Sequence, residues 1–369
     1  MNDVIEKVNE IKGRKYTGSN TRDAKLYHEL PFEEFKHFNR HRGGTQERID
    51  NIIRLVNVKD KTILDLGCSV GGLSFGMAQK GAKYVTGIDY DTESIGVANA
   101  VKEHYKIENI DFLNDELTIE RIRELPKVDI VIWMSQWMWI VKQKGMDYAK
   151  DLLFEVSAKA DIMVFESAAN DGMARIKGAT QDDIEKWLFE NTCYEKITRY
   201  GSTGGWMNRS IFLCTHPLLR IESTRRAASS IITRLGRDRV KKAYRTYPKD
   251  CRWMCKREAK ALRMLEKYDH YPKLIEEGED YIIMNFVGRR NQVKFTQMKF
   301  QADDILKELK RVGLTHRDLV RKNYLAMNNN LYLIDFGWCV FADEDIAKAR
   351  GHRNLPKGTD EEQIKASFG

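Results

Sequence analysis

The sequence has no run of about 18 consecutive apolar residues, so no ordinary membrane-spanning helix is expected. Its first residues, MNDVIEKVNEIKGRKY, are charged throughout and lack the apolar stretch of a secretory signal peptide. Cysteine is also scarce, with 6 in 369 residues and no pair at CxxC spacing. This spacing argues against a zinc site and against a disulfide framework. Together these absences predict a protein of the reducing cytoplasm.

Proline is rare as well, with 6 residues, while 42% of the chain is apolar and 31% is charged. This is the composition of a folded globular protein, and the length predicts two domains, or three. The net charge of +8 is unevenly distributed. Residues 1–216 carry 30 Lys and Arg against 33 Asp and Glu, whereas residues 217–369 carry 32 against 21. The basic second half is either a solvated lysine-rich surface or a surface for a phosphate-bearing partner.

Short apolar runs alternate with helical patterns between residues 61 and 167. The apolar runs are residues 62–67, 83–90, 109–113, 128–134 and 161–167. Such alternation predicts an α/β fold, with a parallel sheet covered by helices on both faces. Residues 193–200 and 209–215 follow as a predicted antiparallel hairpin that completes the sheet. The first domain is therefore expected to span residues 1–216.

The second half has an α+β pattern. Three short strands are expected at 218–226, 229–236 and 238–247, then a helix at 254–268, a strand at 281–288, a helix at 302–313 and a hairpin around residues 328–330. This predicts a compact second domain over residues 217–345, followed by a polar tail over residues 346–369.

A glycine-rich turn, DLGCSVGG at residues 65–72, leaves a predicted strand and enters a predicted helix. Glycines there let the backbone approach a ligand, and the helix start presents amide donors. Asp89 ends the next strand in GIDY, where a carboxylate can accept both hydroxyls of a ribose. The turn and the acid together predict a nucleotide-like ligand.

These two motifs resemble motif I and the acidic second-strand end of the class I S-adenosylmethionine-dependent methyltransferases, which have a Rossmann-like fold. The resemblance implies S-adenosylmethionine as methyl donor. It assigns Asp65, Gly67, Cys68, Gly71 and Gly72 to the methionine end of the cofactor, Asp89 to the ribose and Asp115 to the adenine, with Tyr90 as a further cofactor-binding residue. Asp115 also suits a helix cap.

Six other residues are candidates for this pocket. Arg48 is expected to face the turn and pair with the cofactor carboxylate, a geometry that suits a guanidinium group, although it also suits a surface arginine. Tyr27 and His28 are expected to form a lid. The run SQWMWI is expected to place Ser135, Trp137 and Trp139 near the methyl group, or else its tryptophans serve aromatic packing.

The second half contains HRDLVRKN at residues 316–323 and DFG at residues 335–337. The two motifs in this order resemble the catalytic core of the protein-kinase-like fold. The resemblance implies ATP and Mg2+ as ligands. Asp318 would accept the proton of the acceptor hydroxyl, and Asn323 and Asp335 would hold magnesium. Upstream, Lys242 would contact the phosphates with Glu258 as its partner, and the backbone of Asn285 to Val287 would contact adenine.

Two features depart from that fold. There is no GxGxxG over the phosphates, so Ser229, Ser230 and nearby amides would have to serve. No APE follows DFG, and 32 residues remain after Gly337, which are too few for a peptide-binding lobe. A peptide acceptor is therefore not expected. Compact kinase-like folds of this sort resemble those that act on sugars and lipopolysaccharide, and the resemblance implies a sugar hydroxyl as acceptor.

The order methyltransferase then kinase resembles the bifunctional kinase-methyltransferases that terminate bacterial O-antigen polysaccharide chains. The resemblance implies phosphorylation of a glycan or lipid-linked sugar and methylation of that phosphate, in lipopolysaccharide biosynthesis. Arg209 is a candidate for gripping the phosphate. The sequence departs from the family after Ala342, where no coiled-coil heptads follow, and after the fourth strand, where tryptophans replace histidines.

Alternatives remain open at this point. The kinase-like half is either catalytic or a binding module for a methyltransferase that acts on RNA or a small molecule; nucleic acid fits less well, because the base-methylation motifs are absent. A cytoplasmic location, possibly peripheral to the inner membrane through the basic half, is expected.

Overall fold

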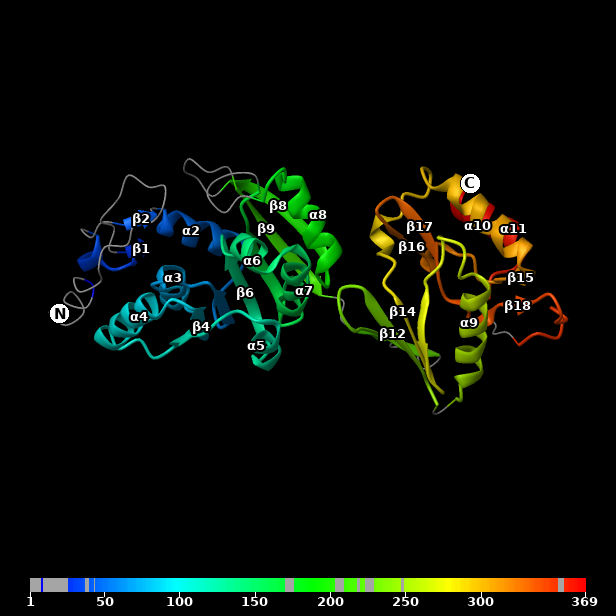
Figure 1. Ribbon diagram of the computed structural model, residues 1–369, viewed down its shortest axis with the longest axis horizontal. Coiled ribbons are helices and arrows are strands. Elements are labelled where there is room, and N and C mark those ends of the chain that lie inside the picture. The colour runs from blue at the N-terminus through cyan, green and yellow to red at the C-terminus, as the bar shows by residue number, and fades with distance from the viewer. Residues whose placement is uncertain are drawn as a thin grey trace. The chain divides into compact units, whose positions relative to one another are not determined.

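The structure is a computed structural model that describes residues 8, 26–36, 40–42, 44–169, 176–202, 209–217, 220–222, 229–246, 249–350 and 355–369. The chain divides into two compact units, Met1–Pro217 and Leu218–Gly369 (Figure 1). In the described ranges, none of the helices combines the length and the apolar character needed to cross a bilayer.

A seven-stranded sheet forms the centre of the first unit, in the order β5-β4-β3-β6-β7-β9-β8. Its strands are β3 (Thr62–Leu66), β4 (Tyr84–Asp89), β5 (Ile110–Asn114), β6 (Val128–Met134), β7 (Ala160–Glu166), β8 (Tyr194–Ser202) and β9 (Ser210–Pro217). The first five are parallel, and β9 runs antiparallel to β7 and β8. The predicted α/β fold and its closing hairpin are confirmed.

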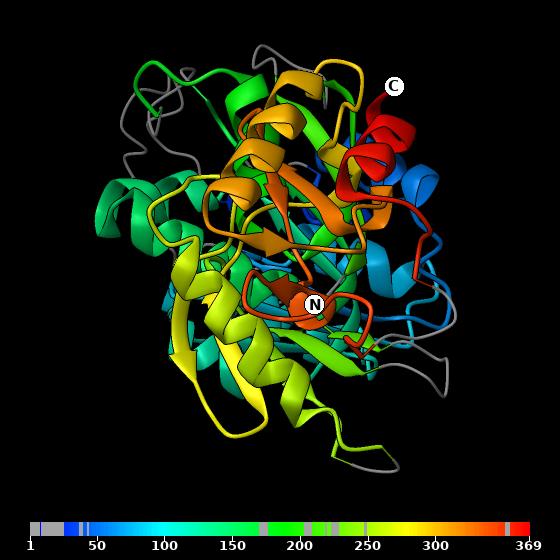
Figure 2. The same ribbon diagram turned by 90° about the vertical axis from the view of Figure 1, so that its right-hand side faces the viewer.

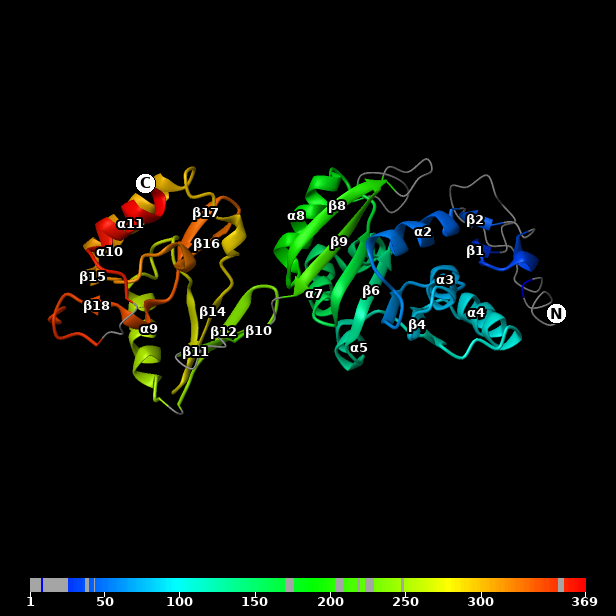
Figure 3. The same cartoon turned by 180° about the vertical axis from the view of Figure 1, so that it is seen from behind.

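Helices cover both faces of this sheet. They are α2 (Thr45–Leu55), α3 (Gly72–Gln79), α4 (Thr92–His104), α5 (Ile119–Glu124), α6 (Trp137–Lys144), α7 (Met146–Ser157) and α8 (Gln181–Asn191). Along β6, Ile130 and Ile132 pack into the core with α2, α3 and α4, whereas Val131 and Trp133 pack into the core with α5 to α8. Because successive strand residues face opposite sides, an apolar run such as VDIVIWM serves both cores. Figures 1 and 3 show the sheet and its helices from the two sides.

A short parallel pair, β1 (Leu26–His28) and β2 (Arg40–Arg42), precedes this sheet, with a 3-10 turn, η1 (Glu33–Phe35), between the two strands. Leu26, Leu30 and Phe35 are buried in the same core as α2 and α3. This segment is therefore packed onto the first unit beside the glycine-rich turn.

The second unit begins with a five-stranded sheet in the order β10-β11-β12-β14-β13. Its strands are β10 (Arg220–Glu222), β11 (Ser230–Arg234), β12 (Arg239–Tyr244), β13 (Leu274–Glu277) and β14 (Tyr281–Asn285), and α9 (Arg252–Met264) packs against them. The pairs are antiparallel, as predicted for the first three strands. Strand β13 has the sequence LIEE, which was not predicted as a strand because its short, charged edge sequence lacks a strand pattern.

The rest of the second unit consists of α10 (Lys299–Arg311), the pairs β15 (Leu314–Thr315) with β18 (Val340–Phe341) and β16 (Tyr324–Met327) with β17 (Asn330–Leu333), and α11 (Asp360–Phe368). Three 3-10 turns, η2 (Arg290–Gln292), η3 (Arg321–Asn323) and η4 (Phe336–Trp338), lie in the connections. Figure 2 shows α11 in red beside α10 in orange.

Helix α11 corrects one expectation, since residues 360–368 were placed in a polar tail. Its buried residues include Ile364 and Phe368, and Phe368 contacts the ring of Tyr324 edge-on and that of Phe295 at a tilt. A capping box between Thr359 and Glu362 starts the helix. The segment is thus part of the core of the second unit.

Candidate functional sites

A cavity of about 470 Å3 lies at the carboxyl ends of β3, β4 and β6. Its lining includes Gly67, Asp89, Asp115, Ser135 and Trp139. In an open parallel sheet this edge is where ligands bind, because the strand-to-helix turns leave a crevice there. The sequence motifs of the first half therefore meet at one cavity.

Asp89 occupies the end of β4 with both carboxylate oxygens anchored. Oδ2 accepts a hydrogen bond from the Ser69 N–H at 2.9 Å, and Oδ1 accepts one from the Asp91 N–H at 3.0 Å. Each oxygen keeps lone-pair capacity for a second donor. Burial raises the pKa of Asp89, and the backbone donors oppose that rise. The carboxylate is thus a fixed acceptor at the cavity wall, as a pair of ribose hydroxyls would require.

The glycine-rich turn is built differently from the expectation. Of its predicted cofactor residues, Gly67 lines the cavity, whereas Cys68, Gly71 and Gly72 do not. A Cβ on Gly72 would lie 2.4 Å from the Glu29 carbonyl oxygen, and Gly71, with φ 81°, lies against the Phe112 ring. These two glycines therefore permit close packing around the turn.

Asp65 also supports the turn from beneath the cavity. It is buried, and its carboxylate accepts a hydrogen bond from Ser74 Oγ at 2.5 Å, in the first turn of α3. Burial raises its pKa to about 6, and the charge of Asp89 adds to that rise while the Ser74 bond opposes it. Asp65 is not part of the cavity lining.

A buried polar cluster not predicted from the sequence lies behind Ser135. The Glu166 carboxylate, at the end of β7, accepts from Ser135 Oγ and pairs with Arg48 at 3.4 Å and with Arg209 at 3.8 Å. Arg209 also donates to Ser135 Oγ at 3.1 Å. The two predicted anion-binding arginines, Arg48 and Arg209, therefore share one carboxylate. Neither of them lines the cavity itself. The sequence signal that could have identified Glu166 is its place as an acid at the end of an apolar strand, in VFES.

Trp137 lies away from the cavity, so of the two alternatives left open for it the structure shows aromatic packing. It is buried, its indole N–H donates to the Ala149 carbonyl at 2.9 Å, and its ring contacts those of Phe165 and Trp187. Ser135 and Trp139, from the same run, line the cavity. Because Trp137 and Trp139 both belong to helix α6, these residues two apart face different sides.

Three further predicted residues border the cavity. His28 and Tyr90 line it, and so does Asp115, which also pairs with the Arg121 guanidinium at 2.6 Å. The backbone of Tyr27 lies in β1, but its side chain lies outside the described residues.

In the second unit, Lys242 of β12 meets two carboxylates. Its Nζ lies 2.6 Å from Glu258 Oε2 on α9 and 2.8 Å from Asp335 Oδ1. Burial works to lower the pKa of Lys242, but the charges of Asp335 and Glu258 outweigh burial and raise it. The Tyr244 hydroxyl also donates to Glu258. The period of two along β12 puts Tyr244 on the same face as Lys242, a signal that sequence reasoning did not use.

The predicted base Asp318 lies on a loop held by its own neighbours. Asn323 Nδ2 donates to the Asp318 carbonyl at 2.7 Å, and the Asp318 N–H donates to His316 Nδ1 at 3.2 Å. His316 is fully buried, and burial lowers its pKa. Its Nε2 lies 3.1 Å from the Ile334 carbonyl, next to Asp335. The HRD and DFG motifs are thus joined through a neutral imidazole.

Helix α11 fixes the same loop from the other side. The Asp360 carboxylate accepts from the N–H groups of His316 and Arg317 at 2.7 and 2.9 Å. Gln363 Oε1 accepts from the Leu319 N–H at 2.8 Å, and Ser367 Oγ donates to the Leu319 carbonyl at 3.0 Å. The capping-box pattern TDEE was the only sequence signal for this helix.

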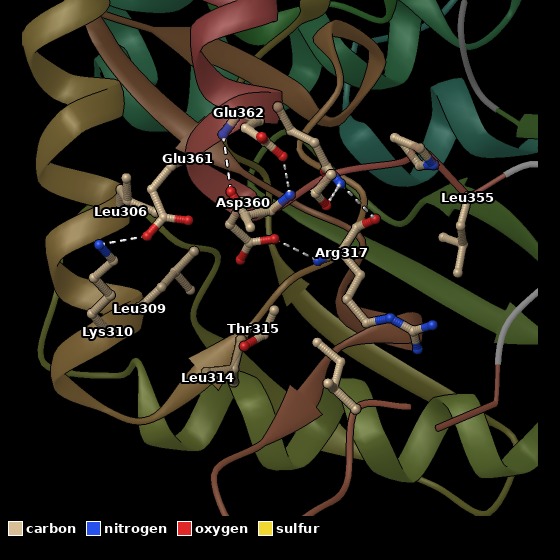
Figure 4. Close-up of a pocket in the computed structure, with 15 residues that line it drawn as sticks. Leu306, Leu309, Lys310, Leu314, Thr315, Arg317, Leu355, Asp360, Glu361 and Glu362 are labelled. Atoms are coloured by element: carbon tan, nitrogen blue, oxygen red, sulfur yellow. Dashed lines mark hydrogen bonds and ion pairs between the residues drawn. The ribbon is translucent and has the colours of Figure 1, made fainter. Parts of the chain in front are cut away.

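A cavity of about 460 Å3 lies between α10, the start of α11 and Arg317 (Figure 4). Its lining mixes leucines with the ion pair of Lys310 and Glu361. Asp318, Asn323 and Asp335 do not line it, so it is separate from the predicted catalytic groups.

The predicted hinge is partly used by the protein itself. The Asn285 N–H donates to the Lys273 carbonyl at 3.1 Å, and the Phe286 N–H donates to the Asp238 carbonyl at 2.7 Å. Val287 is buried beside them. The backbone N–H of Asn285 is therefore engaged within the sheet. Of the two residues predicted to contact adenine, Val287 is the one left to test. Residues 225–228, expected to cover the phosphates together with Ser229 and Ser230, lie outside the described residues.

Known protein families match both units. A family described as "Methyltransferase domain" matches residues 57–205, and one described as "RIO domain" matches residues 228–353. The O-antigen chain terminator bifunctional methyltransferase/kinase WbdD of Escherichia coli is 31% identical over 157 residues, which cover 41% of this chain and 21% of that protein. The chain thus spans about a fifth of the length of this relative.

Another protein and a solved structure are also similar to this chain, the first over a quarter of its length and the second at low identity. Protein arginine N-methyltransferase 1 of Saccharomyces cerevisiae is 33% identical over 104 residues, covering 25% of this chain and 27% of that protein. A solved structure of the bifunctional kinase-methyltransferase WbdD is 21% identical, and the match covers 92% of this chain and 83% of that one, with a TM-score of 0.45. Residues 57–205 thus match a methyltransferase domain and residues 228–353 match a RIO domain, and over 157 residues the chain is homologous to the O-antigen chain terminator bifunctional methyltransferase/kinase WbdD.

Proposed function

We propose that this chain is a bifunctional enzyme with two successive activities. Its RIO domain transfers a phosphoryl group from ATP to a sugar hydroxyl at the end of a glycan, and its methyltransferase domain methylates that phosphate with S-adenosylmethionine. The observation that carries the proposal is the contact of the buried Lys242 with the buried Glu258 at 2.6 Å and with the half-buried Asp335 at 2.8 Å. Burying a charged lysine and glutamate costs stability unless they pair, and a lysine held in this way between two acids favours a catalytic purpose.

In phosphoryl transfer the protein contributes mainly positioning and charge. Asp318 accepts the proton of the acceptor hydroxyl, and Lys242 holds the nucleotide phosphates while Glu258 and Tyr244 orient its ammonium group. Asn323 donates through Nδ2 to the Asp318 carbonyl, so its amide oxygen remains for a cation.

The donor set suits magnesium, which binds proteins through one or two carboxylates and completes its shell with phosphate oxygens and water. Asn323 and Asp335 would hold the ion, which neutralises phosphate charge when bound. Among the described residues no group of three His, Cys, Asp or Glu could hold a metal by protein ligands alone. A metal at this site would therefore depend on the nucleotide.

For the methyl donor, the cavity at the strand ends offers a matching set of groups. Asp89 would accept the ribose hydroxyls beside Tyr90, and the turn from Gly67 to Ser69 would pass along the methionine end. Asp115 would border the adenine. The donor supplies an activated methyl group, so the protein needs to align the acceptor rather than activate it.

The arginines behind Ser135 support a phosphate acceptor. Arg209 donates to the hydroxyl of Ser135, which lines the cavity, and Arg48 shares Glu166 with it. A phosphate monoester is already anionic and needs no base to accept a methyl group. From behind the cavity lining, the two guanidinium groups would favour an anionic acceptor, the product of the first reaction, through their charge and through Ser135.

Location and partners follow from charge. We place the enzyme in the cytoplasm, where the basic second half, with 32 Lys and Arg against 21 Asp and Glu, would face an anionic membrane surface or a lipid-linked sugar.

The test uses the full chain with ATP, Mg2+, S-adenosylmethionine and a mannose oligosaccharide, followed by mass spectrometry. We expect gain of a phosphate and then of a methyl group on the same molecule. Asp318→Ala should abolish both gains, while a chemically phosphorylated mannoside should restore methylation. Asp345→Ala, which removes an exposed acid paired with Lys348, should leave both intact.

Two results would contradict the proposal. Methylation of the unphosphorylated sugar without ATP would identify the RIO domain as a binding module. Methylation of RNA that weakens steeply with salt, with no change in the sugar, would favour a nucleic-acid methyltransferase.

A further inference from the structure

The residue directly before Glu258 on α9 joins this helix to the segment that follows the DFG motif. The Arg257 guanidinium group makes a two-pronged ion pair with Glu344, in which Nη1 donates to Oε2 at 2.6 Å and Nη2 donates to Oε1 at 2.8 Å. Nη1 also donates to the Cys339 carbonyl at 2.8 Å. Because a bidentate pair of arginine and carboxylate has a fixed geometry, it constrains the orientation of α9 as well as its distance from this segment.

The acid of this pair is itself fixed to β18. The Phe341 N–H donates to Glu344 Oε2 at 3.0 Å, and the Glu344 N–H donates to the Phe341 carbonyl at 2.9 Å. Two cations of α9 lie over the Phe341 ring, with Arg257 Cζ at 5.3 Å and Lys260 Nζ at 3.9 Å from its centroid. The helix is therefore held against β18 by an ion pair and by an aromatic ring.

Strand β18 in turn connects the two motif loops of the proposed kinase site. Phe341 pairs with Leu314 of β15, and the HRD motif begins directly after that strand. Cys339, whose carbonyl Arg257 binds, lies between the 3-10 turn of the DFG motif and β18. Arg257 thus links the helix that carries Glu258 to the strand pair from which both loops extend.

The pair of Arg257 and Glu344 is better shielded from water than the other arginine pairs of α9. The side chain of Arg257 is 22% exposed, whereas those of Arg252 and Arg263 are 42% and 57% exposed. The hydrogen bond from Arg257 lowers the pKa of Glu344 to about 2, so Glu344 is ionised at neutral pH. Since exposed pairs contribute little, Arg257 is the best suited of these three arginines to hold the helix.

We propose that Arg257 is a positioning residue for phosphoryl transfer, which acts through its ion pair with Glu344 to hold α9 where Glu258 meets Lys242. This inference rests on the proposed kinase function. Without the ion pair, α9 moves relative to β18 and the 2.6 Å contact of Glu258 with Lys242 is lost. Lys242 then keeps Asp335 as its partner, and its ammonium group is drawn out of line with the nucleotide phosphates.

The test is a double-mutant cycle on phosphorylation of the mannose oligosaccharide by the full chain with ATP and Mg2+. Arg257→Met should lower kcat/KM for ATP about 10- to 100-fold, because misplacing a catalytic group by about 1 Å has effects of this size. In the Glu258→Gln background, where Lys242 has already lost its charged partner on α9, the same substitution should cost less than about twofold. A glutamine still accepts a hydrogen bond from Lys242, so this background keeps a measurable rate. If Arg257 served only the stability of the fold, the loss would be equal in the two backgrounds.

Two further variants keep the test independent of a folding defect. Glu344→Gln retains an oxygen for the Phe341 N–H but loses the charge, so the rate should fall about 3- to 10-fold. Arg257→Glu places two acids together, and adding Glu344→Arg to it should recover the rate at least about tenfold by restoring the ion pair with reversed polarity.

The matched control is Arg263→Met, which removes an exposed arginine paired with Glu277 on the same helix and should leave the rate within about twofold. An Arg257→Met rate equal to that of wild type, an equal loss in the Glu258→Gln background, or no recovery in the reversed pair would each overturn the inference. A wild-type chain that transfers no phosphoryl group from ATP would instead refute the kinase function, and the inference with it.

Discussion

Asp360 holds Arg317 in a backbone conformation that residues other than glycine rarely adopt. Arg317 has φ 71°, and its N–H donates to Asp360 Oδ1 at 2.9 Å, while Oδ2 accepts from the adjacent N–H of His316. Such a left-handed residue persists only where the surroundings hold it. Asp318 follows directly, so this carboxylate sets the direction of the proposed base.

Asp360→Asn should therefore slow phosphorylation by about 100-fold, because an amide has one acceptor oxygen for two donors and misplaced catalytic groups lose rate steeply. The affinity for S-adenosylmethionine, measured by calorimetry, should not change. Glu361→Gln removes the neighbouring surface ion pair with Lys310 and should leave the rate within about twofold. An unaltered rate for Asp360→Asn would show that α11 has no positioning role.

Tyr244→Phe should have a smaller effect on the same reaction. The hydroxyl of Tyr244 is one of the donors that orient Glu258 toward Lys242, and a neutral donor of this kind contributes about 0.5–1.5 kcal/mol. We expect kcat/KM for ATP to fall about 3- to 10-fold in a steady-state assay. Tyr281→Phe, which removes a hydroxyl bonded to Glu276 at an exposed site, is the control and should behave as wild type. Equal loss of activity in both variants would contradict the proposal that Tyr244 orients Glu258 toward Lys242.

The two tryptophans of α6 should separate binding from stability. Trp139→Leu removes a ring from the cavity lining, and we expect the Kd for S-adenosylmethionine to rise about 3- to 10-fold with little change in unfolding. Trp137→Leu should lower the free energy of unfolding of the first unit by about 2–4 kcal/mol and leave the Kd unchanged. Urea denaturation and calorimetry measure the two quantities. The reverse assignment of effects would contradict the placement of these side chains.

Asp65 should make the first unit less stable as the pH rises. Its pKa in the folded state is raised to about 6 from an ordinary value near 3.8, so folding favours the protonated form. Below the ordinary pKa the group is protonated in both the folded and the unfolded state, so the free energy of unfolding is not reduced. Above pH 6 it is ionised in both states, and the free energy of unfolding is lower by up to about 3 kcal/mol. Asp65→Asn should remove this dependence between about pH 4 and pH 6. Hydrogen exchange of β3 and β4 in both proteins measures it, and parallel profiles would show that Asp65 does not titrate in this range.

The sequence predicted the fold well where patterns are regular. Parallel strands buried on both faces are nearly all apolar, and each of the runs from TILDLG to DIMVFES is a strand. The pairing of Lys242 with Glu258 was also predicted, from the resemblance to the protein-kinase-like fold, and it is observed. Strand β13 and helix α11 were missed, because neither has an apolar pattern long enough to recognise.

The site was less predictable where side chains act through one another. Glu166 and Asp360 are distant in sequence from the residues they hold, and no local pattern reports such a contact. The glycine-rich turn shows the opposite problem. Its residues resemble ligand contacts, yet position 72 needs a glycine because a Cβ there would lie 2.4 Å from the Glu29 carbonyl oxygen. Motifs specify which residues matter, and packing decides which of them face the ligand.

The support of the HRD loop by α11 has a consequence for synthesis of the chain. His316 and its supporting acid, Asp360, are 44 residues apart, so the loop leaves the ribosome before the helix that holds it. The methyltransferase unit ends at Pro217 and is complete earlier. Nascent chains should thus acquire methyl-donor binding first and nucleotide turnover only after α11 has emerged and docked.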